Sequence, residues 1–564
     1  MKTILLRIRT IVQKTLVQES PMGEFIRRLG ESKNSAKRWH YVTYDQLHSA
    51  LLPEHQSPTE LGLVFIETTW KANQIPYHKQ KLALLLSNQR NFALEMKKKG
   101  HPIHYEFGSQ PYEHILKSMS TKFQELSVCE PAERMLRIQL EQLDKIGAIN
   151  ILPHKGWLTS NEDFVKSVGE KPPWRMDKFY RYVRKSKNIL MDQNNKPEGG
   201  EWSYDDLNRQ PWDGAVELPQ LPTFDANPIT NEVVEMIQRK FSHHPGQLQI
   251  ENIPSTYEQT QQLWNWAKSN VMYWFGPYED AMTTEHKTLF HTTISSLLNL
   301  HRLLPSEAVN DALALDIPLN SKEGFVRQII GWREFVHHVH RHTDGFNANV
   351  PEENHHIRSG AGWNGEWAKP RSTLNVLEAH FPLPDAYWGK KSGMMCLDSA
   401  VEQVVETGYT HHIPRLMVLA NLGTLLGVNP RELTDWFWAM FTDAYDWVVE
   451  PNVLAMGTYA VGEIMTTKPY VCGTPYIKKM GDYCGSCALH HKKSCPISDM
   501  YWNFLQENST QFVKNHRMSM PIRMLAKREP SKIQSYAAVT NYVKDQLHNG
   551  RQLDAEHLEM LKSG

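Results

Sequence analysis

The chain has 564 residues, of which 40% are apolar and 22% charged, and this balance excludes a disordered or fibrous protein. Lys and Arg together number 62, and so do Asp and Glu, so overall charge gives no argument for nucleic acid as a partner. No run reaches the roughly 18 apolar residues of a membrane span, and arginines interrupt the apolar amino terminus, MKTILLRIRTIVQ. With only six cysteines, we expect a soluble protein of the reducing cytoplasm.

Four segments follow one another along the chain. Residues 1–38 carry nine Lys or Arg against three Glu, which predicts an appended, partly helical basic arm. From 39 to 165, short apolar runs such as LGLVFIET alternate with helical stretches, which predicts an α/β domain with a parallel, Rossmann-like sheet. No G-x-G-x-x-G follows the first strand, so a dinucleotide site is not expected there. Residues 166–250 predict a connector that packs against both halves, and 251–564 shows the 3.6-residue period of a helical domain.

Four cysteines of the helical half form a pattern typical of metal sites. The stretch YCGSCALHHKKSCP, residues 483–496, spaces three of them as C-x2-C-x7-C, and the fourth lies upstream at Cys396. Thiolates suit either a tetrahedral zinc ion or a cubane 4Fe–4S cluster, and the spacing does not separate the two. A disulfide arrangement is the alternative. Lysines and arginines around the motif form either a solvated helix face or a surface for phosphates.

Two further motifs carry candidate cofactor contacts. LFHTTISSLLN, residues 289–299, places hydroxyl groups near a helix start, where they either cap the helix or bind a phosphate. EGFVRQIIGWREF, residues 323–335, sets Arg333 in an apolar helix. A buried guanidinium requires a partner, which is either a salt bridge or a cofactor.

The motif YTHHIPRLM, residues 409–417, places two adjacent histidines before Arg415. Successive helix residues point about 100° apart, so His411 and His412 cannot both face the same side. One of them is a candidate proton donor near neutral pH, and the other is a structural residue. Asp443, farther along the chain, is the expected partner of Arg415.

In this order, the motifs resemble the photolyase/cryptochrome superfamily, and closely its iron–sulfur bacterial branch, which includes prokaryotic (6-4) photolyases. The resemblance spans about 39–530. It rests on GFVRQIIGWREF, THHIPRLM, DAYDWV with PNV, TKPYVCGTPYIKKMGDYCGSC, CPISDMYWNF and, in the connector, PEGGEWSYDDLNRQP. It implies an antenna-binding α/β domain over 39–165, followed by a large all-α domain over 251–564 that binds FAD and a 4Fe–4S cluster.

The resemblance also implies an activity. This is light-driven repair of pyrimidine (6-4) photoproducts by electron transfer from reduced FAD, with UV-damaged DNA as the partner. A cryptochrome-type blue-light photoreceptor, with a signalling partner on the arm of residues 1–38, is the first alternative. An iron–sulfur nucleic-acid protein that works without light is the second. The antenna implied for the α/β domain is 6,7-dimethyl-8-ribityllumazine.

The resemblance assigns roles residue by residue. The cluster ligands are Cys396, Cys484, Cys487 and Cys495. The FAD contacts are Phe275, Asp280, His291, Thr292, Ser295, Trp332, Arg333, Arg415, Asp443 and Asn452, with Val449 and Glu450 as alternatives to Asn452 opposite flavin N5. His412 is the catalytic histidine with His411 beside it, and the electron-transfer aromatics are Trp388, Trp436 and Tyr476.

Three residues depart from the pattern of the relatives, one of them Phe437, which follows Trp436 where a tyrosine can occur. His301 stands where they usually have glycine, after the segment that contacts the flavin. Lys71 stands in a stretch where they place an acidic residue near the antenna, which puts the affinity or identity of the antenna in question.

Overall fold

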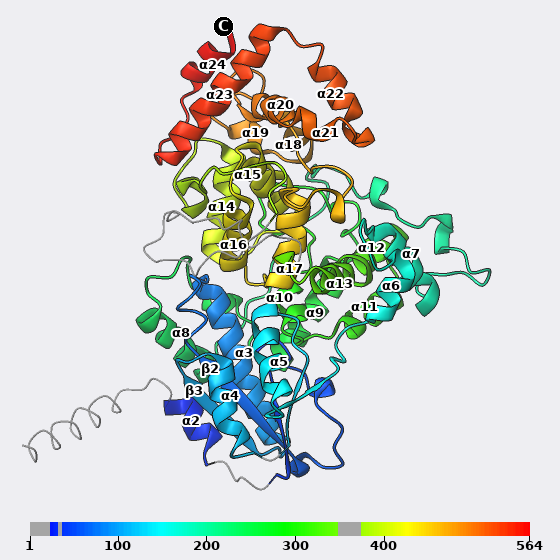
Figure 1. Ribbon diagram of the computed structural model, residues 1–564, viewed down its shortest axis with the longest axis vertical. Coiled ribbons are helices and arrows are strands. Elements are labelled where there is room, and N and C mark those ends of the chain that lie inside the picture. The colour runs from blue at the N-terminus through cyan, green and yellow to red at the C-terminus, as the bar shows by residue number, and fades with distance from the viewer. Residues whose placement is uncertain (1–22, 32–35, 124, 348–373, 564) are drawn as a thin grey trace, which may run out of the picture.

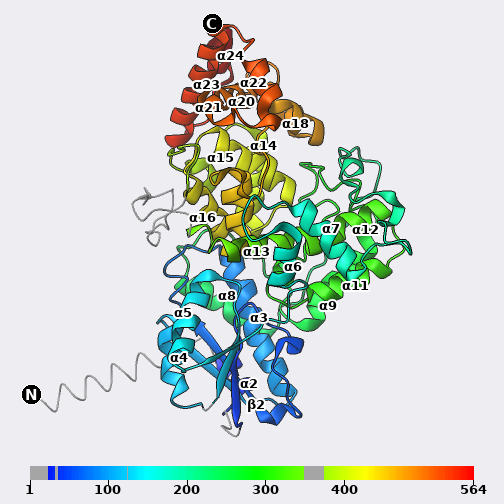
Figure 2. The same ribbon diagram turned by 45° about the vertical axis from the view of Figure 1, so that its right-hand side comes forward.

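The computed structural model describes residues 23–31, 36–123, 125–347 and 374–563, which form an α/β part and a larger helical part (Figures 1 and 2). Most of the predicted basic arm, 1–22 and 32–35, lies outside the described residues. In Figure 1 the α/β part is mainly blue and stands at the bottom, and the carboxyl-terminal helices, in red, stand at the top.

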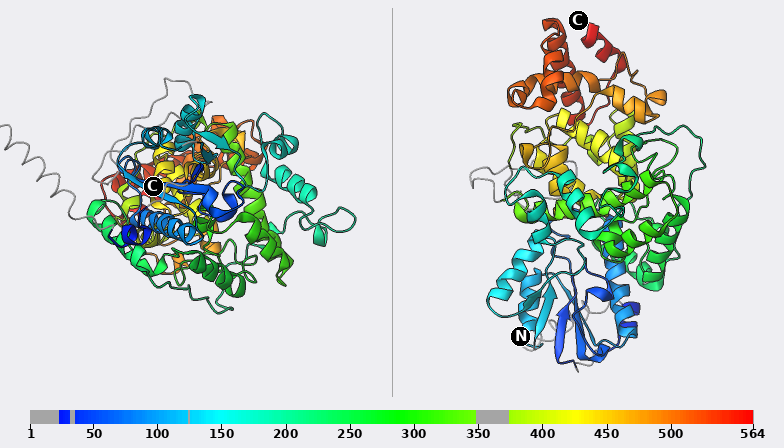
Figure 3. Two further views of the ribbon diagram at one scale, coloured as in Figure 1. Left: turned by 90° about the horizontal axis from the view of Figure 1, so that it is seen from below. Right: turned by 90° about the vertical axis from the view of Figure 1, so that its right-hand side faces the viewer.

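A five-stranded parallel sheet organises the α/β part and confirms the prediction. Its strand order is β3-β2-β1-β4-β5. The middle strand pairs Tyr41 with Val64 of β2 on one side and with Val128 of β4 on the other. The chain order reverses at β1, and the carboxyl ends of the strands face the helical part, where such sheets bind ligands (Figure 3). The strands are β1 (Arg38–Tyr41), β2 (Leu61–Thr68), β3 (Ile103–Gly108), β4 (Leu126–Cys129) and β5 (Asn150–Leu152).

The described end of the arm is a helix, α2 (Gly23–Leu29), that packs against the α/β part. Phe25 is fully buried, and the carboxylate of Glu232 accepts the backbone N–H groups of Glu24 and Phe25 at 3.0 Å each. These two donors have no partner within the first turn of the helix, so Glu232 caps it. The helices of this part are α3 (Lys79–Lys98), α4 (Tyr112–Ser120) and α5 (Arg134–Lys145), and Glu232 belongs to α8 (Pro228–Lys240).

The connector contacts both parts of the molecule. Its helix α8 packs on α3, whereas α7 (Met176–Lys187) packs on the π-helical segment η6 (Arg327–Arg333) of the helical part. The carboxylate of Glu323 accepts hydrogen bonds from the hydroxyl of Tyr180 at 2.8 Å and from the backbone N–H of Tyr204 at 3.1 Å. The structure also extends a helix, α6 (Asn161–Val168), across the expected boundary at 165.

The rest of the described chain is helical, as its period predicted. Among the residues described, no helix combines the length and the apolar character that crossing a membrane requires. The helices are α9 (Tyr257–Asn270), α10 (Ser295–Asn299), α11 (Pro305–Ala314), α12 (Leu319–Val326), α13 (Glu334–His342), α14 (Met395–Thr407), α15 (Asn421–Leu425), α16 (Pro430–Met440), α17 (Asp446–Val449), α18 (Thr474–Met480), α19 (Tyr483–Ser486), α20 (Ile497–Glu507), α21 (Ser509–Phe512), α22 (Ser519–Leu525), α23 (Pro530–His548) and α24 (Ala555–Ser563), with π-helical segments η9 (Pro414–Ala420) and η10 (Glu450–Gly457).

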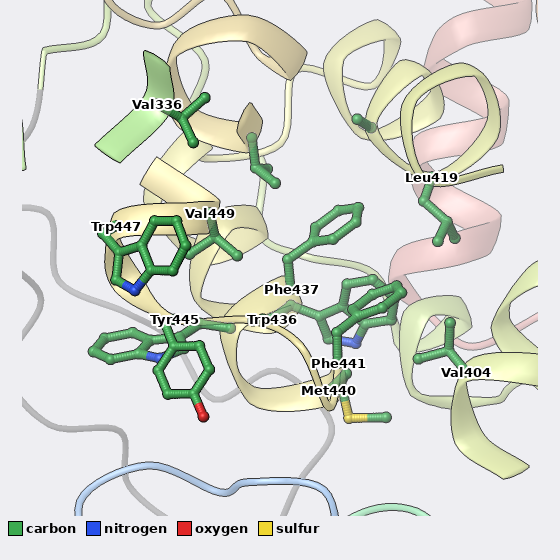
Figure 4. Packing of buried hydrophobic residues seen from close by; sticks show 14 of the residues in the cluster. Val336, Val404, Leu419, Trp436, Phe437, Met440, Phe441, Tyr445, Trp447 and Val449 are labelled. Carbon is green, nitrogen blue, oxygen red and sulfur yellow. The ribbon is translucent and has the colours of Figure 1, made fainter. Parts of the chain in front are cut away.

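Aromatic side chains fill the core of the helical part around α16. Trp436 is fully buried, and Trp447 is 2% exposed. Figure 4 shows Trp436 grouped with Phe437 and Phe441, while Trp447 lies apart from them near Tyr445. Rings of this size bury large apolar areas, so these residues supply much of the stability of the helical part.

Candidate flavin site and thiol site

The helical part encloses a cavity of about 290 Å³, which we call the central cavity. Nine of the ten predicted FAD contacts line it, and so does His412. The tenth, Asp280, lies outside the lining and contacts His412 instead. The lining residues that the sequence singled out are Phe275, His291, Thr292, Ser295, Trp332, Arg333, Arg415, Asp443 and Asn452.

Three π-helical segments bring side chains to this cavity. Segment η6 carries Trp332 and Arg333, η9 carries Arg415, and η10 carries Asn452. A π turn adds one residue to a helical turn and is frequent at functional sites. The sequence motifs did not reveal this irregularity, because their apolar period is the same as that of a regular helix.

Arg415 and Asp443 form the strongest ion pair of the cavity wall. The two guanidinium Nη atoms donate to the two carboxylate oxygens at 3.0 Å each, as predicted for this pair. The hydroxyl of Ser295 donates to the same carboxylate at 2.6 Å. Burial raises the pKa of Asp443, but the Arg415 guanidinium and these hydrogen bonds outweigh it and hold the pKa below its ordinary value. Asp443 is therefore a carboxylate at neutral pH.

Arg333 has a salt-bridge partner, and it also faces the cavity. The partner is Glu334, at 3.4 Å. Its guanidinium stands 4.2 Å from the ring of Trp157, a residue that the motifs did not single out. Burial lowers the pKa of Arg333 to about 10, so it remains charged at neutral pH.

The hydroxyl-rich turn before α10 has a strained backbone. Helix α10 begins at Ser295, as predicted, and Thr293 just before it has a φ of 56°. A β-branched residue rarely adopts this left-handed conformation, and such outliers gather at ligand sites. Thr292, Thr293 and Ser295 all line the cavity, so the strained turn faces the place where a ligand would bind.

Three histidines meet at the mouth of the central cavity. The rings of His291 and His411 stack at 4.3 Å with 16° between their planes, and His412 stands edge-on to His291 at 5.4 Å. Their nitrogens come within 4.8 Å of one another. A nitrogen lone pair lies in its ring plane, so the two stacked rings cannot both point at one metal ion. We therefore read the group as a cluster of packed rings, in which Nε2 of His291 and Nδ1 of His411 are buried without a hydrogen-bond partner among the described residues.

The two adjacent histidines differ in their surroundings, as the helical geometry predicted. His411 is buried, and burial, followed by the neighbouring His291 and His412, holds its pKa well below the ordinary value. The side chain of His412 is 45% exposed, and its Nε2 lies 3.4 Å from a carboxylate oxygen of Asp280. Only His412 can therefore meet a substrate from outside.

Asp280 gathers side chains from three distant segments. It accepts a hydrogen bond from the hydroxyl of Tyr476 at 3.4 Å and lies 3.8 Å from Nε of Arg209, in addition to its contact with His412. Arg209 belongs to the connector motif PEGGEWSYDDLNRQP, which was the only sequence signal that could have drawn attention to it.

The four predicted cluster ligands lie together. Helix α14, which carries Cys396, packs on α19, which carries Cys484. Burial, followed by Cys495, Cys487 and Cys484, raises the pKa of Cys396 well above its ordinary value. No disulfide joins these cysteines, all of which the structure describes.

The structure has relatives along most of its length. Residues 40–252 match the family of deoxyribodipyrimidine photo-lyase-related proteins. A (6-4) photolyase of Agrobacterium fabrum (strain C58) is 29% identical over 484 residues, which cover 81% of this chain and 89% of that protein. Over most of its length the chain is therefore similar to a photolyase.

Solved structures of the superfamily share the fold. A class III photolyase of Agrobacterium tumefaciens has a TM-score of 0.54 at 14% identity, over 92% of this chain and 99% of that one. A cryptochrome of Synechocystis sp. PCC6803 has a TM-score of 0.50 at 12% identity, over 90% of this chain and 100% of that one. Both similarities are in the fold, that is, in how the helices and strands are arranged.

The aromatic residues assigned to electron transfer fall into two places of this photolyase-like fold. Trp436 stands edge-on to Phe437 at 5.1 Å, Phe437 stacks on Phe441 at 5.1 Å, and Arg415 lies over Phe441 at 4.3 Å. This row of rings joins Trp436 to the cavity wall. Trp388 ends the short helical turn Asp385–Trp388, whose Tyr387 carbonyl accepts the indole N–H of Trp436 at 3.0 Å. Tyr476 lies elsewhere, at Asp280.

A second cavity of about 430 Å³, which we call the sheet-edge cavity, opens at the carboxyl ends of β2 and β3. Trp438 and Tyr445 of the helical part close it. Lys71 lines it and forms an ion pair with Glu133. Lys81 also lines it and donates to the carbonyl of Trp438 at 2.7 Å.

Proposed function

We propose that this protein is a DNA photolyase of the iron–sulfur branch that uses light and FAD to repair pyrimidine (6-4) photoproducts. The observation that carries the proposal is the exposed His412, held by Asp280 at the mouth of a cavity that nine predicted FAD contacts line. The name of the Agrobacterium fabrum relative supports the lesion type.

The residues of the central cavity fit FAD. The hydroxyls of Thr292 and Ser295 and the strained turn between them suit a diphosphate, and Arg415 with Asp443 provides a fixed pair of charges for the ring system. FAD held by these residues would supply light-driven electron transfer to the lesion and back. The chain's own part is to orient the flavin, to exclude water and to provide the proton.

His412 is the residue that we assign to the proton. Its imidazole is 45% exposed, and the contact of its Nε2 with the Asp280 carboxylate at 3.4 Å orients the ring. His411 stacks on His291 and is held neutral, so its role is to position its neighbour. A damaged base is already weakly stacked, so turning it out of the helix toward His412 costs only about a few kcal/mol.

Basic residues beside this mouth support DNA as the partner. Burial lowers the pKa of Lys468, and the nearby Arg517 and Arg209 lower it further, which places these three cations together. Arg209 also reaches Asp280. Residues 508–528 contain no Asp or Glu, so the chain that follows the thiol site continues this positive surface.

We assign a 4Fe–4S cluster to Cys396, Cys484, Cys487 and Cys495. The structure describes all four thiols, and α19, which carries Cys484, packs on α14, which carries Cys396. Four thiolates suit a tetrahedral zinc ion as well as a cubane, and the resemblance to the iron–sulfur branch favours the cubane. We take its role to be structural, since it would tie the last quarter of the chain to α14.

Iron and sulfide analysis of the purified protein tests this assignment. We expect Cys396→Ala to lose the cluster and with it solubility or flavin, whereas Cys472→Ala, which changes a cysteine outside the four, keeps both. A Cys396→Ala protein that stays soluble and keeps its flavin would contradict the structural role.

The antenna proposal concerns the sheet-edge cavity, which we assign to 6,7-dimethyl-8-ribityllumazine. Its position at the carboxyl edge of a parallel sheet is the expected place for a ligand. The resemblance implies an acidic residue at the position of Lys71. In this chain Lys71 pairs with Glu133, so the polar end of the antenna would face an ion pair instead of a lone carboxylate.

A repair assay tests the main proposal. An oligonucleotide with one (6-4) lesion is illuminated with blue light in the presence of the protein and a reductant. We expect intact oligonucleotide from the wild type and almost none from His412→Ala. Light-induced flavin reduction without any repair by the wild type would instead support the cryptochrome alternative.

A further inference from the structure

A third cavity, of about 670 Å³, lies apart from the two already described, and we call it the histidine cavity. Its wall contains four histidines, more than either of the others. The lining residues used below are Glu130, Pro131, Pro153, His154, Trp157, Leu158, Asp163, Lys187, His337 and Arg341.

The histidine cavity opens at the carboxyl ends of β4 and β5. Glu130 directly follows β4, and Pro153 directly follows β5. The sheet-edge cavity opens at β2 and β3, on the other side of β1. Parallel sheets bind ligands beyond their carboxyl ends where the strand order reverses, and here that edge provides two separate cavities.

A wall of stacked groups separates the histidine cavity from the central cavity. One side of Trp157 carries His337, whose ring stacks on it at 3.6 Å, and Arg333 of the central cavity lies 4.2 Å from the same indole. Trp447, which lines the central cavity, stands edge-on to Trp157 at 5.1 Å. A ligand of one cavity therefore does not extend into the other.

The acidic residues of the histidine cavity already have partners. Glu130 forms an ion pair with Arg341. Asp163 accepts the backbone N–H of Ser160 at 2.9 Å and its hydroxyl at 3.0 Å, as the cap of α6. Neither carboxylate therefore needs a cation from a ligand.

The hydrogen-bond donors of the same wall are left over. In the part of the chain that the structure describes, Nη1 of Arg341 and Nδ1 of His337 are buried without a hydrogen-bond partner. His337 is only 9% exposed. Lys187, at the end of α7, is exposed and lies near Asp163. Burial raises the pKa of Asp163, but the hydrogen bonds from Ser160 and then the charge of Lys187 outweigh it and lower the pKa. Buried donors without partners are costly, so the wall is built to meet an acceptor-rich group.

The back of the cavity contains a strained residue. His301 has a φ of 53°, the left-handed conformation that glycine adopts easily and other residues rarely do. Its ring lies 4.8 Å from that of His154 in the cavity wall, and its Nδ1 donates to the carbonyl of Asp45 at 2.7 Å. The backbone strain at His301 thus places a second imidazole behind the cavity wall, next to that of His154.

We propose that the histidine cavity binds an organic phosphate of nucleotide size. Lys187, His337 and Arg341 approach from two helices, and a terminal phosphate offers enough acceptor oxygens for all three. The apolar surfaces of Pro131, Pro153 and Leu158 are available to the organic part. This site is independent of the proposed repair activity, because it shares no cavity with His412.

Binding of AMP to the flavin-loaded protein, measured by isothermal titration calorimetry, tests the proposal. Adenosine and inorganic phosphate serve as probes that lack one half of the ligand. We expect AMP to bind at least about tenfold more tightly than adenosine, since charge-assisted hydrogen bonds to the phosphate provide this much. AMP should also bind more tightly than inorganic phosphate.

Two variants locate the site. Lys187→Gln and Arg341→Gln should each weaken AMP binding about tenfold or more, with flavin content unchanged. Lys185→Gln is the matched control, because Lys185 belongs to the same last turn of α7 but lies over Trp202 and outside the cavity lining. No binding of AMP, equal binding of adenosine, or wild-type affinity in Lys187→Gln would each overturn the proposal.

Discussion

The central cavity and the sheet-edge cavity both contain ion pairs, but they differ in what they expose. At the sheet-edge cavity Lys71 pairs with Glu133, and Arg90 pairs with Glu67 at 2.6 Å. The central cavity contains the Arg415–Asp443 pair and, in addition, His412, whose side chain is 45% exposed. The first arrangement can hold a molecule, whereas the second can also react with one. This difference fits the antenna proposed for the α/β part and the chemistry proposed for the helical part.

Removal of His412 should give the largest effect. We expect His412→Ala to lower the rate of (6-4) repair by at least about a hundredfold, the usual contribution of a general acid, and to leave flavin binding intact. His114→Ala is the control, since this histidine is 61% exposed on the α/β part. Repair at an unchanged rate in His412→Ala would remove the distinction between the two cavities.

Asp443→Ala should destabilise the wall of the central cavity and weaken its binding of flavin. It leaves the Arg415 guanidinium, which is only 22% exposed, without its carboxylate, and this should lower the free energy of unfolding by about 3 kcal/mol and reduce the flavin content. Glu402→Ala removes an exposed pair, with Lys391, and should cost less than about 1 kcal/mol. Chemical denaturation with flavin absorbance measures both, and equal losses would show that burial of the pair is unimportant.

Lys71→Met tests the same comparison between the two cavities by changing the sheet-edge cavity. Glu133, whose side chain is fully buried, would lose its ion-pair partner, and we expect the free energy of unfolding to fall by about 2 kcal/mol. The antenna absorbance should disappear, while flavin content and repair under light absorbed directly by the flavin stay unchanged. Lys155→Met is the control, because its contact with Glu54 is exposed. A loss of flavin in Lys71→Met would mean that the cavities are not independent.

The smallest effect is a dependence on pH. The pKa of Asp443 is depressed in the folded protein, so its ion pair stabilises the fold above the ordinary value of 3.8, and this contribution is lost as the pH falls through the depressed pKa. The difference in stability between the wild type and Asp443→Ala should therefore be constant from pH 7 to about 4 and should shrink below it. A difference that shrinks already near pH 6 would point to a histidine.

Most of the central cavity was predictable because its residues belong to compact motifs. GFVRQIIGWREF and THHIPRLM each place several contacts within a few residues, and a resemblance to a known family then assigns them together. Asp280 shows the limit of this reasoning. The motif that contains it suggested a flavin contact, but the structure places its carboxylate at His412, because the direction of a side chain depends on the packing of three segments that are distant in the chain.

The sequence by itself determined the order of an α/β part and a helical part, the four thiols and the paired histidines, since period, composition and spacing are local properties. Tertiary structure decided which histidine is exposed, that Trp157 separates two cavities, and that the carboxyl edge of the sheet provides two sites. Burial and the sharing of hydrogen bonds arise only when distant segments meet. For this reason the leftover donors of the histidine cavity have no signature in the sequence.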